Sequence, residues 1–164
     1  MMTTAAIPTI RFATPADAEL ILDFIRGLAE YERAAELVET TPAMLRSQMV
    51  AADPPFECLI AEYEGEAAGF ALFFRNYSTW TGRPGLYLED FFVPQRFRGR
   101  GIGKALFKRM AQLVLERGWA RMEWAVLDWN RPAHAFYRAC GSEAKDEWTV
   151  WRLAGEALAR VARD

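Results

Sequence analysis

The sequence predicts an α/β fold with a mixed central β-sheet flanked by helices. Apolar runs typical of strands alternate along the chain with apolar residues at helical spacing. Hydrophobic residues make up 52% of the 164 residues and aromatic residues 13%, which excludes a disordered chain. At this length we expect one domain, over residues 5–164, that buries about two-thirds of its unfolded surface.

The first half of the chain begins with a strand at Ile7–Phe12. Thr14 before Pro15 is typical of a helix start, and Thr41 before Pro42 repeats this signal for a shorter helix that ends near Val50. Two strands joined by a Glu-Gly-Glu turn follow, at Phe56–Tyr63 and Ala67–Arg75.

The second half alternates strands and helices after a loop at Asn76–Gly85. Helix ends are marked by proline near the start and glycine at the end, as in the helix from Asn130 to Cys140 before Gly141. The predicted elements are a strand at Leu86–Val93, a helix at Gly101–Arg117, a strand at Arg121–Leu127, the helix from Asn130, a strand at Trp148–Leu153 and a helix at Glu156–Ala162. The order is β-α-α-β-β-β-α-β-α-β, with a short C-terminal helix.

Residues 98–104 read Arg-Gly-Arg-Gly-Ile-Gly-Lys, between a predicted strand and a predicted helix. A glycine turn before a helix N-terminus binds anions through free N–H groups and the helix dipole. The spacing fits neither the dinucleotide pattern G-x-G-x-x-G nor the nucleoside-triphosphate loop. We therefore expect a phosphate carried by another kind of ligand.

Charge along the chain is uneven although the net charge is only −2. Six basic residues and no acid lie between Phe91 and Leu115, which indicates either a solvated helix face or a site for a small polyanion. A nucleic-acid partner is not expected, because no second basic patch exists. One histidine and two cysteines argue against a metal centre or a disulfide framework. No apolar run is long enough for a membrane span and no secretory signal is evident, so we expect a cytoplasmic protein.

Two acids, Glu89 and Asp90, interrupt the otherwise apolar strand Leu86–Val93. They indicate either an edge strand with one wet face or a carboxylate that acts as a general base. Neighbouring strand residues point to opposite faces, so the two acids need not share a pocket. Glu89 should lie within about 15–20 Å of the glycine turn.

At this point the chain resembles the GNAT superfamily of N-acetyltransferases, whose phosphate motif is matched by Arg98-Gly99-Arg100-Gly101-Ile102-Gly103. It resembles the diamine (spermidine/spermine) acetyltransferase branch in particular. The matching segments are Leu-Ala-x-Tyr-Glu at 28–32, Tyr-Leu-Glu-Asp-Phe-Phe-Val at 87–93, Trp-Asn-x-Pro at 129–132, Phe-Tyr at 136–137 and Trp-Arg-Leu at 151–153. The resemblance implies a GNAT-like fold and acetyl-CoA as donor, with no metal.

The resemblance also implies roles for individual residues. Glu89 would deprotonate the amine, and Tyr137 would protonate the departing thiolate, although local evidence alone favours packing for this tyrosine. Cofactor contacts would come from the main chain of Phe91, Phe92 and Val93, from the turn residues Arg98, Gly99, Arg100, Gly101, Ile102, Gly103 and Lys104, and from Asn130. The amine site would use Tyr31, Glu32, Trp80, Glu89 and Asp90.

The expected reaction is direct transfer of an acetyl group to a primary amine of a small molecule. An alkylamine with a pKa near 10.4 is protonated at neutral pH, so a base must act before attack on the thioester. Ser78 and Thr149 stand where the branch commonly has acids, so we expect a diamine or lysine-like amine rather than spermine. An antibiotic amine, a protein N-terminus, or a CoA-binding domain without turnover stay as alternatives. The family is commonly dimeric, so a homodimer is expected.

Overall fold

The structure is a computed structural model that describes residues 6–163. These residues form two compact units, which divide after Ala125. Residues 1–5 and 164, at the ends of the predicted domain and in the segment searched for a secretory signal, lie outside the described residues. The expectation of one domain stays a prediction.

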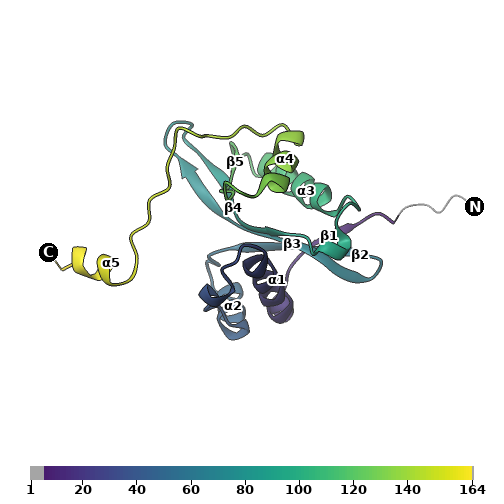
Figure 1. The fold of residues 1–164 in the computed structure, drawn as a ribbon, viewed down its shortest axis with the longest axis horizontal. Coiled ribbons are helices and arrows are strands. Elements are labelled where there is room, and N and C mark those ends of the chain that lie inside the picture. Colours follow the sequence, from purple (N-terminus) through teal and green to yellow (C-terminus); the bar gives the residue numbers. More distant parts are fainter. Residues whose placement is uncertain (1–5, 164) are drawn as a thin grey trace, which may run out of the picture. The chain divides into compact units, whose positions relative to one another are not determined.

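The first unit is built on a five-stranded mixed sheet in the order β1-β2-β3-β4-β5. Antiparallel pairing joins the first four strands, and β5 runs parallel to β4. The strands are β1 (Thr9–Phe12), β2 (Glu57–Tyr63), β3 (Glu66–Ser78), β4 (Arg83–Phe92) and β5 (Met122–Glu123). Helices α1 (Ala18–Tyr31) and α2 (Pro42–Met49) cover one face of this sheet, and α3 (Ile102–Glu116) covers the other (Figure 1).

The predicted helix starts are confirmed. The backbone N–H of Thr14 donates to Asp17 Oδ2 at 2.7 Å, within a one-turn 3₁₀ helix that leads into α1. Thr41 Oγ1 accepts from the N–H of Met44 at 3.2 Å, so its hydroxyl caps α2. These caps fix the residue at which each helix begins.

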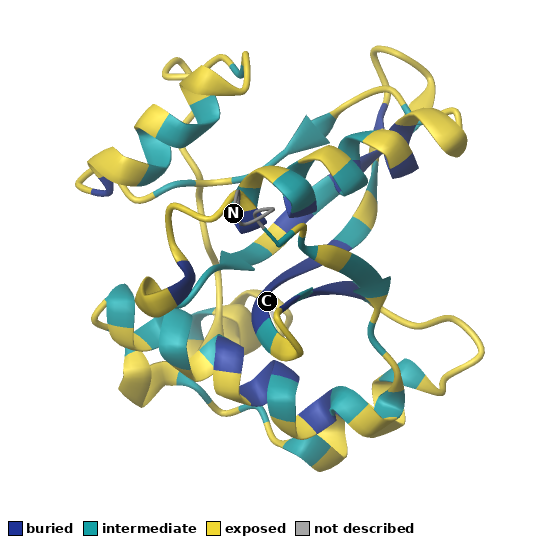
Figure 2. Cartoon of the chain, turned by 90° about the vertical axis from the view of Figure 1, so that its right-hand side faces the viewer, coloured by how far each residue is buried: buried dark blue, intermediate teal, exposed yellow. Residues whose placement is uncertain are grey.

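Two hydrophobic cores lie on the two faces of the sheet, where the dark residues of Figure 2 gather. The α3 core contains Phe73 and Leu88 of the sheet together with Leu106 and Met110 of the helix. The α1–α2 core contains Phe24 and Phe70, whose rings stack at 5.2 Å. Because both faces are covered, the central strands read as continuous apolar runs.

Two glycines allow close packing around Phe92, near the end of β4. A Cβ on Gly27 of α1 would lie 2.8 Å from Phe92 Cε1, and a Cβ on Gly69 of β3 would lie 2.9 Å from the Phe92 carbonyl oxygen. Glycine therefore lets α1 and β3 approach the end of β4 more closely than any other residue would.

The hairpin between β3 and β4 is longer than predicted. The loop expected at Asn76–Gly85 is wrong over most of its length, because pairing continues to Ser78 opposite Arg83 and leaves a turn of residues 79–82. Ser78 is buried and its Oγ accepts from the N–H of Thr81 at 3.3 Å. Here Ser78 holds the hairpin turn.

Two other predicted strands differ from the structure. The strand expected at Arg121–Leu127 is limited to Met122–Glu123, the two residues that pair with β4. The segment Trp148–Leu153 is exposed and forms no strand within the described residues, since apolar character alone provides no pairing partner. The second unit contains the helices α4 (Arg131–Ala139) and α5 (Gly155–Val161).

We predict that Gly69→Ala lowers the free energy of unfolding by about 1–3 kcal/mol, because the new methyl group meets the backbone oxygen of Phe92. Gly27→Ala is the comparison, and we expect it to lose less stability. Its methyl group meets only the edge of the Phe92 ring, and alanine in a helix is favoured over glycine by about 1 kcal/mol. Urea denaturation measures both. Equal losses in the two variants would contradict the importance of the backbone contact.

Candidate functional site

The glycine turn forms an open N-terminus on α3. Gly99 and Gly101 adopt the left-handed conformation, with φ of 76° and 79°. Gly101 is the N-cap of α3, no side chain caps the helix, and nothing described lies within 4 Å of a Cβ built on either glycine. The N–H groups of the first turn of α3, which follow at Ile102, Gly103 and Lys104, suit an anion that approaches the main chain closely.

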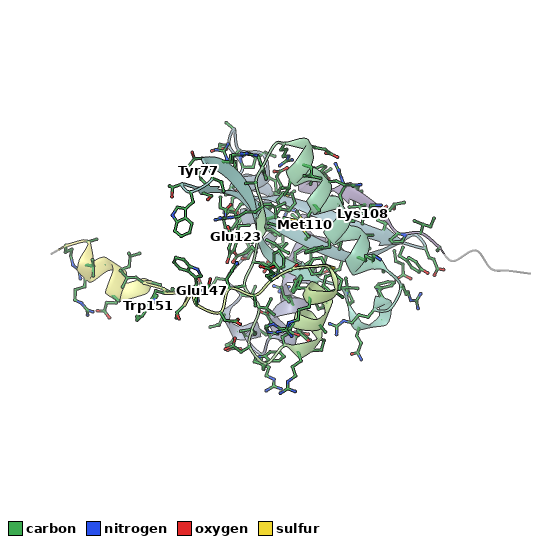
Figure 3. The ribbon with its side chains drawn as sticks, turned by 90° about the horizontal axis from the view of Figure 1, so that it is seen from above. Tyr77, Lys108, Met110, Glu123, Glu147 and Trp151 are labelled. Carbon is green, nitrogen blue, oxygen red and sulfur yellow. The ribbon has the colours of Figure 1, made fainter. Side chains whose placement is uncertain are left out.

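The basic residues near the turn fall into two groups. Arg96 and Arg100 pair with Glu66 and Glu64 of the β2–β3 turn, at 3.2 and 3.8 Å. Lys104 and Lys108 are exposed on α3 and make no ion pair with any residue of the described chain. Figure 3 shows Lys108 near Met110, which is buried on the core side of the same helix. The two lysines therefore add positive charge to the exposed side of α3.

Arg98 connects the glycine turn to the end of α1. Its Nε donates to the carbonyl of Val93 at 3.0 Å, and its guanidinium lies 5.0 Å from the ring centroid of Tyr31. A cation over an aromatic face is stabilised by the ring quadrupole. Sequence reasoning assigned Arg98 to the cofactor and missed this contact, which no sequence signal indicates.

A β-bulge at Glu89 changes the direction of side chains along β4. Leu88 pairs with Phe73 and Asp90 pairs with Leu72, so Glu89 is an extra residue without a partner position on β3. Before the bulge Leu88 faces the α3 core, whereas after it Phe92 faces the α1–α2 core. Asp90 shares the face of Leu72, which belongs to the α1–α2 core.

The two acids interact through their charges, and whether they share a pocket stays a prediction. Asp90 is half-buried, and its pKa is raised to about 6 by burial first, then by the charges of Glu89 and Glu32. Burial also raises the pKa of Glu32, at the end of α1. Glu89 itself is exposed. We call Glu32, Glu89 and Asp90 the acidic cluster; it suits a cationic group.

Beyond the bulge, β4 ends between the acidic cluster and the glycine turn. Pairing with β5 stops at Tyr87 and Glu123. Phe91 and Val93 pack against the α3 core, and Phe92 packs against the α1–α2 core. With their side chains in the cores, these residues would meet a ligand through their main chain, as the resemblance implies.

The structure brings three predicted substrate residues together, since the charges of Glu32 and Glu89 act on Asp90. Tyr31 precedes Glu32 at the end of α1, and its ring contacts Arg98. Trp80 lies in the hairpin turn and is strongly exposed. Glu89 follows Arg83 by six strand positions, about 20 Å, so Trp80 is remote from the cluster within this unit.

The remaining predicted residues belong to the second unit. The side chain of Asn130 caps α4 by accepting from the N–H of Ala133 at 3.3 Å. The Tyr137 ring meets the Phe136 ring edge-on at 5.3 Å. The roles of Asn130 toward the cofactor and of Tyr137 as an acid stay predictions.

The family model described as "Acetyltransferase (GNAT) family" matches residues 22–142. The thialysine N-epsilon-acetyltransferase of Bos taurus is 38% identical over 168 residues, which cover 96% of this chain and 98% of that protein. The L-ornithine N5-acetyltransferase NATA1 of Arabidopsis thaliana is 28% identical over 197 residues, with 93% and 86% covered. An aminoglycoside N-acetyltransferase AAC(6')-Iy in complex with CoA has a TM-score of 0.72 at 21% identity, with 93% and 99% covered.

This chain belongs to the GNAT acetyltransferase family. The predicted fold class, the diamine branch and the predicted activity, acetyl-CoA-dependent N-acetyl transfer to an amine of a small molecule, are confirmed. The open glycine turn and its lysines fit the phosphates of CoA. Among the described residues, no group of three or more histidine, cysteine or acidic side chains could hold a metal, and no helix could cross a membrane.

We predict that Asp90→Asn stabilises the protein at pH 7.5 and has little effect near pH 4. The folded pKa of Asp90, about 6, lies above its ordinary value of 3.8, so the folded state binds the extra proton. Stability is therefore lost as the pH rises from about 4 to 6, and the asparagine removes that loss, about 1–3 kcal/mol.

Urea denaturation at pH 4.5, 6.0 and 7.5 measures this effect. Asp23→Asn is the matched control, because Asp23 is exposed on α1. A stabilisation by Asp90→Asn that does not change with pH would contradict the burial of a charged Asp90.

Proposed function

We propose that this enzyme acetylates the side-chain amine of a lysine-like amino acid or of a short diamine. The observation that supports this most strongly is the acidic cluster, in which the charges of Glu89 and Glu32 act on Asp90 near the end of β4. Carboxylates in this neighbourhood attract a primary ammonium. The names of the relatives agree, since thialysine and ornithine are both amino acids with a terminal amine.

Glu89 acts as the general base in this proposal. It is the exposed member of the cluster, and the bulge places it on the same side of the strand as Asp90. Because an alkylammonium does not attack a thioester, a proton must leave the amine, directly to Glu89 or through water. Glu32 and Asp90 would hold the charged amine before that step.

In this proposal the donor lies along the main chain at the end of β4, next to the acidic cluster. The thioester of acetyl-CoA supplies the activated acyl group. The turn from Arg98 to Lys104 would hold its pyrophosphate through main-chain N–H groups, and Phe91–Val93 would bind its pantetheine through main-chain hydrogen bonds. A backbone N–H near Phe92–Val93 would stabilise the tetrahedral oxyanion. Asn130 would contact the cofactor and Tyr137 would protonate the leaving thiolate.

The resemblance and the sequence also support a homodimer in the cytoplasm, with neither nucleic acid nor membrane as a partner. These parts of the proposal rest on sequence grounds alone. Sedimentation equilibrium of the full chain measures the oligomeric state.

We expect short amines to be preferred over long polyamines in a thiol-release assay with acetyl-CoA. The panel is thialysine, lysine, ornithine, 1,3-diaminopropane, spermidine and spermine. Efficient turnover of the short amines is expected. A long polyamine needs a carboxylate for its distal ammonium, and Ser78, buried and bonded within the hairpin turn, does not supply one. Equal kcat/KM for spermine and the short amines would contradict this specificity.

We predict that Glu89→Gln lowers kcat by about 10²–10⁴-fold while acetyl-CoA affinity stays within twofold. Tyr137→Phe should lower kcat with the same retention of donor binding. Calorimetric titration with CoA and steady-state kinetics separate the two quantities. Glu30→Gln, an exposed acid on α1, is the control. Full activity of both test variants would refute the assigned roles.

A further inference from the structure

Three polar residues meet on the sheet face that carries the acidic cluster, with Glu123 opposite Tyr87, two strand positions from Glu89, and the other two beside Gly85. Asn76 of β3 donates through Nδ2 to Glu123 Oε2 at 2.9 Å, and Arg121 Nε forms an ion pair with the same oxygen at 2.9 Å. We call Asn76, Arg121 and Glu123 the polar triad; Glu123 is labelled in Figure 3. All three belong to the first unit.

The face of the triad follows from strand register. Glu123 pairs with Tyr87 across the parallel ladder, and Tyr87 pairs with Phe74, which shares a face with Leu72 by strand alternation. Leu72 belongs to the α1–α2 core, and Asp90, which pairs with Leu72, lies on the same face of the sheet. The charges of Glu89 and Glu123 both raise the pKa of Tyr87, after burial, so both acids lie near this phenol.

The triad lies beyond the part of this face that α1 and α2 cover. Phe74, Tyr87 and Glu123 do not belong to the α1–α2 core of the described residues, and each is half-buried. The side chains of Arg121 and Glu123 are 42% and 40% exposed. Within the first unit the side chains of the triad are therefore partly open to solvent.

A glycine keeps this arrangement in place. A Cβ on Gly85 would lie 2.6 Å from Asn76 Oδ1 and 3.4 Å from Arg121 Cγ. The side chains of Asn76 and Arg121 thus occupy the space above Gly85. Between them and the acidic cluster, the rings of Phe74 and Tyr87 stack at 5.1 Å and provide an apolar surface.

We infer that the polar triad binds the amino-acid head group of the acceptor, with Glu123 receiving the α-ammonium and Arg121 the α-carboxylate. The inference rests on the proposed function. Glu123 lies two strand positions from Glu89, about 7 Å, and a lysine-like chain reaches roughly 6 Å from its terminal nitrogen to its α-carbon. Arg121 lies two positions further, beside Gly85, and its long side chain reaches back to Glu123. The terminal amine then lies at the acidic cluster, and the alkyl chain crosses Phe74 and Tyr87.

The chemistry of the triad fits a zwitterion better than a simple diamine. Glu123 accepts a hydrogen bond from Asn76 and pairs with Arg121, and both contacts orient its carboxylate. Arg121 makes its one ion pair in the described chain through Nε, which leaves its terminal NH₂ groups for a carboxylate. A diamine would use Glu123 but would have nothing to offer Arg121.

The test compares thialysine with the diamine that remains when its carboxyl group is removed, using Arg121→Gln, Glu123→Gln and the control Arg75→Gln. Arg75 is exposed and pairs with Leu86, so it lies on the opposite face of β3. For Arg121→Gln we expect kcat/KM to fall at least about tenfold on thialysine, through KM, and to change less than twofold on the diamine. Glu123→Gln should weaken both acceptors, and Arg75→Gln neither.

Activity on the diamine shows that each variant is folded, and Arg121→Lys should recover part of the loss on thialysine. Equal effects of Arg121→Gln on the two acceptors, or no effect, would overturn the head-group assignment while leaving the proposed function in place. A wild-type enzyme that acetylates neither acceptor would overturn both the assignment and the proposed function.

Discussion

The extra residue in β4 is the constraint on which the site depends. Without the bulge at Glu89, strict alternation would send Glu89 and Asp90 to opposite faces of the sheet. With it, Asp90 takes the α1 side, and Phe91 and Val93 turn to the α3 core. In the proposed function, one inserted residue lets a single strand supply acids to one ligand and main chain to another.

Close packing at the end of β4 holds this arrangement. Gly27 and Gly69 let α1 and β3 pack against Phe92. Gly27 lies about one helical turn before Tyr31, and Phe92 lies two residues after Asp90. Burial of Asp90 raises its pKa to about 6, so ionisation of this carboxyl group costs stability. In the proposed function, this cost is offset by binding of the ammonium.

Sequence reasoning predicted the elements that have strong local signals. The proline-marked starts of α1 and α2 and the glycine turn before α3 follow from backbone chemistry that acts within a few residues. It was less successful for strand ends, which depend on pairing with other strands. The hairpin beyond Arg75 and the two-residue β5 depend on partners that the local sequence does not specify. The bulge has one sequence signal, two adjacent acids in a buried strand. Its effect on the direction of the side chains follows only from the pairing register of β3 and β4.

The contact between Arg98 and Tyr31 links the glycine turn to the end of α1, two segments that the chain order keeps apart. One guanidinium holds the carbonyl of Val93 and lies over the ring next to Glu32. In the proposed function, movement of the turn on donor binding would therefore reach the acceptor side through Tyr31. Such coupling is reciprocal, so the acceptor would influence donor affinity to the same extent. Changes made at Tyr31 to alter amine preference would thus be read out partly as altered cooperativity between the two substrates.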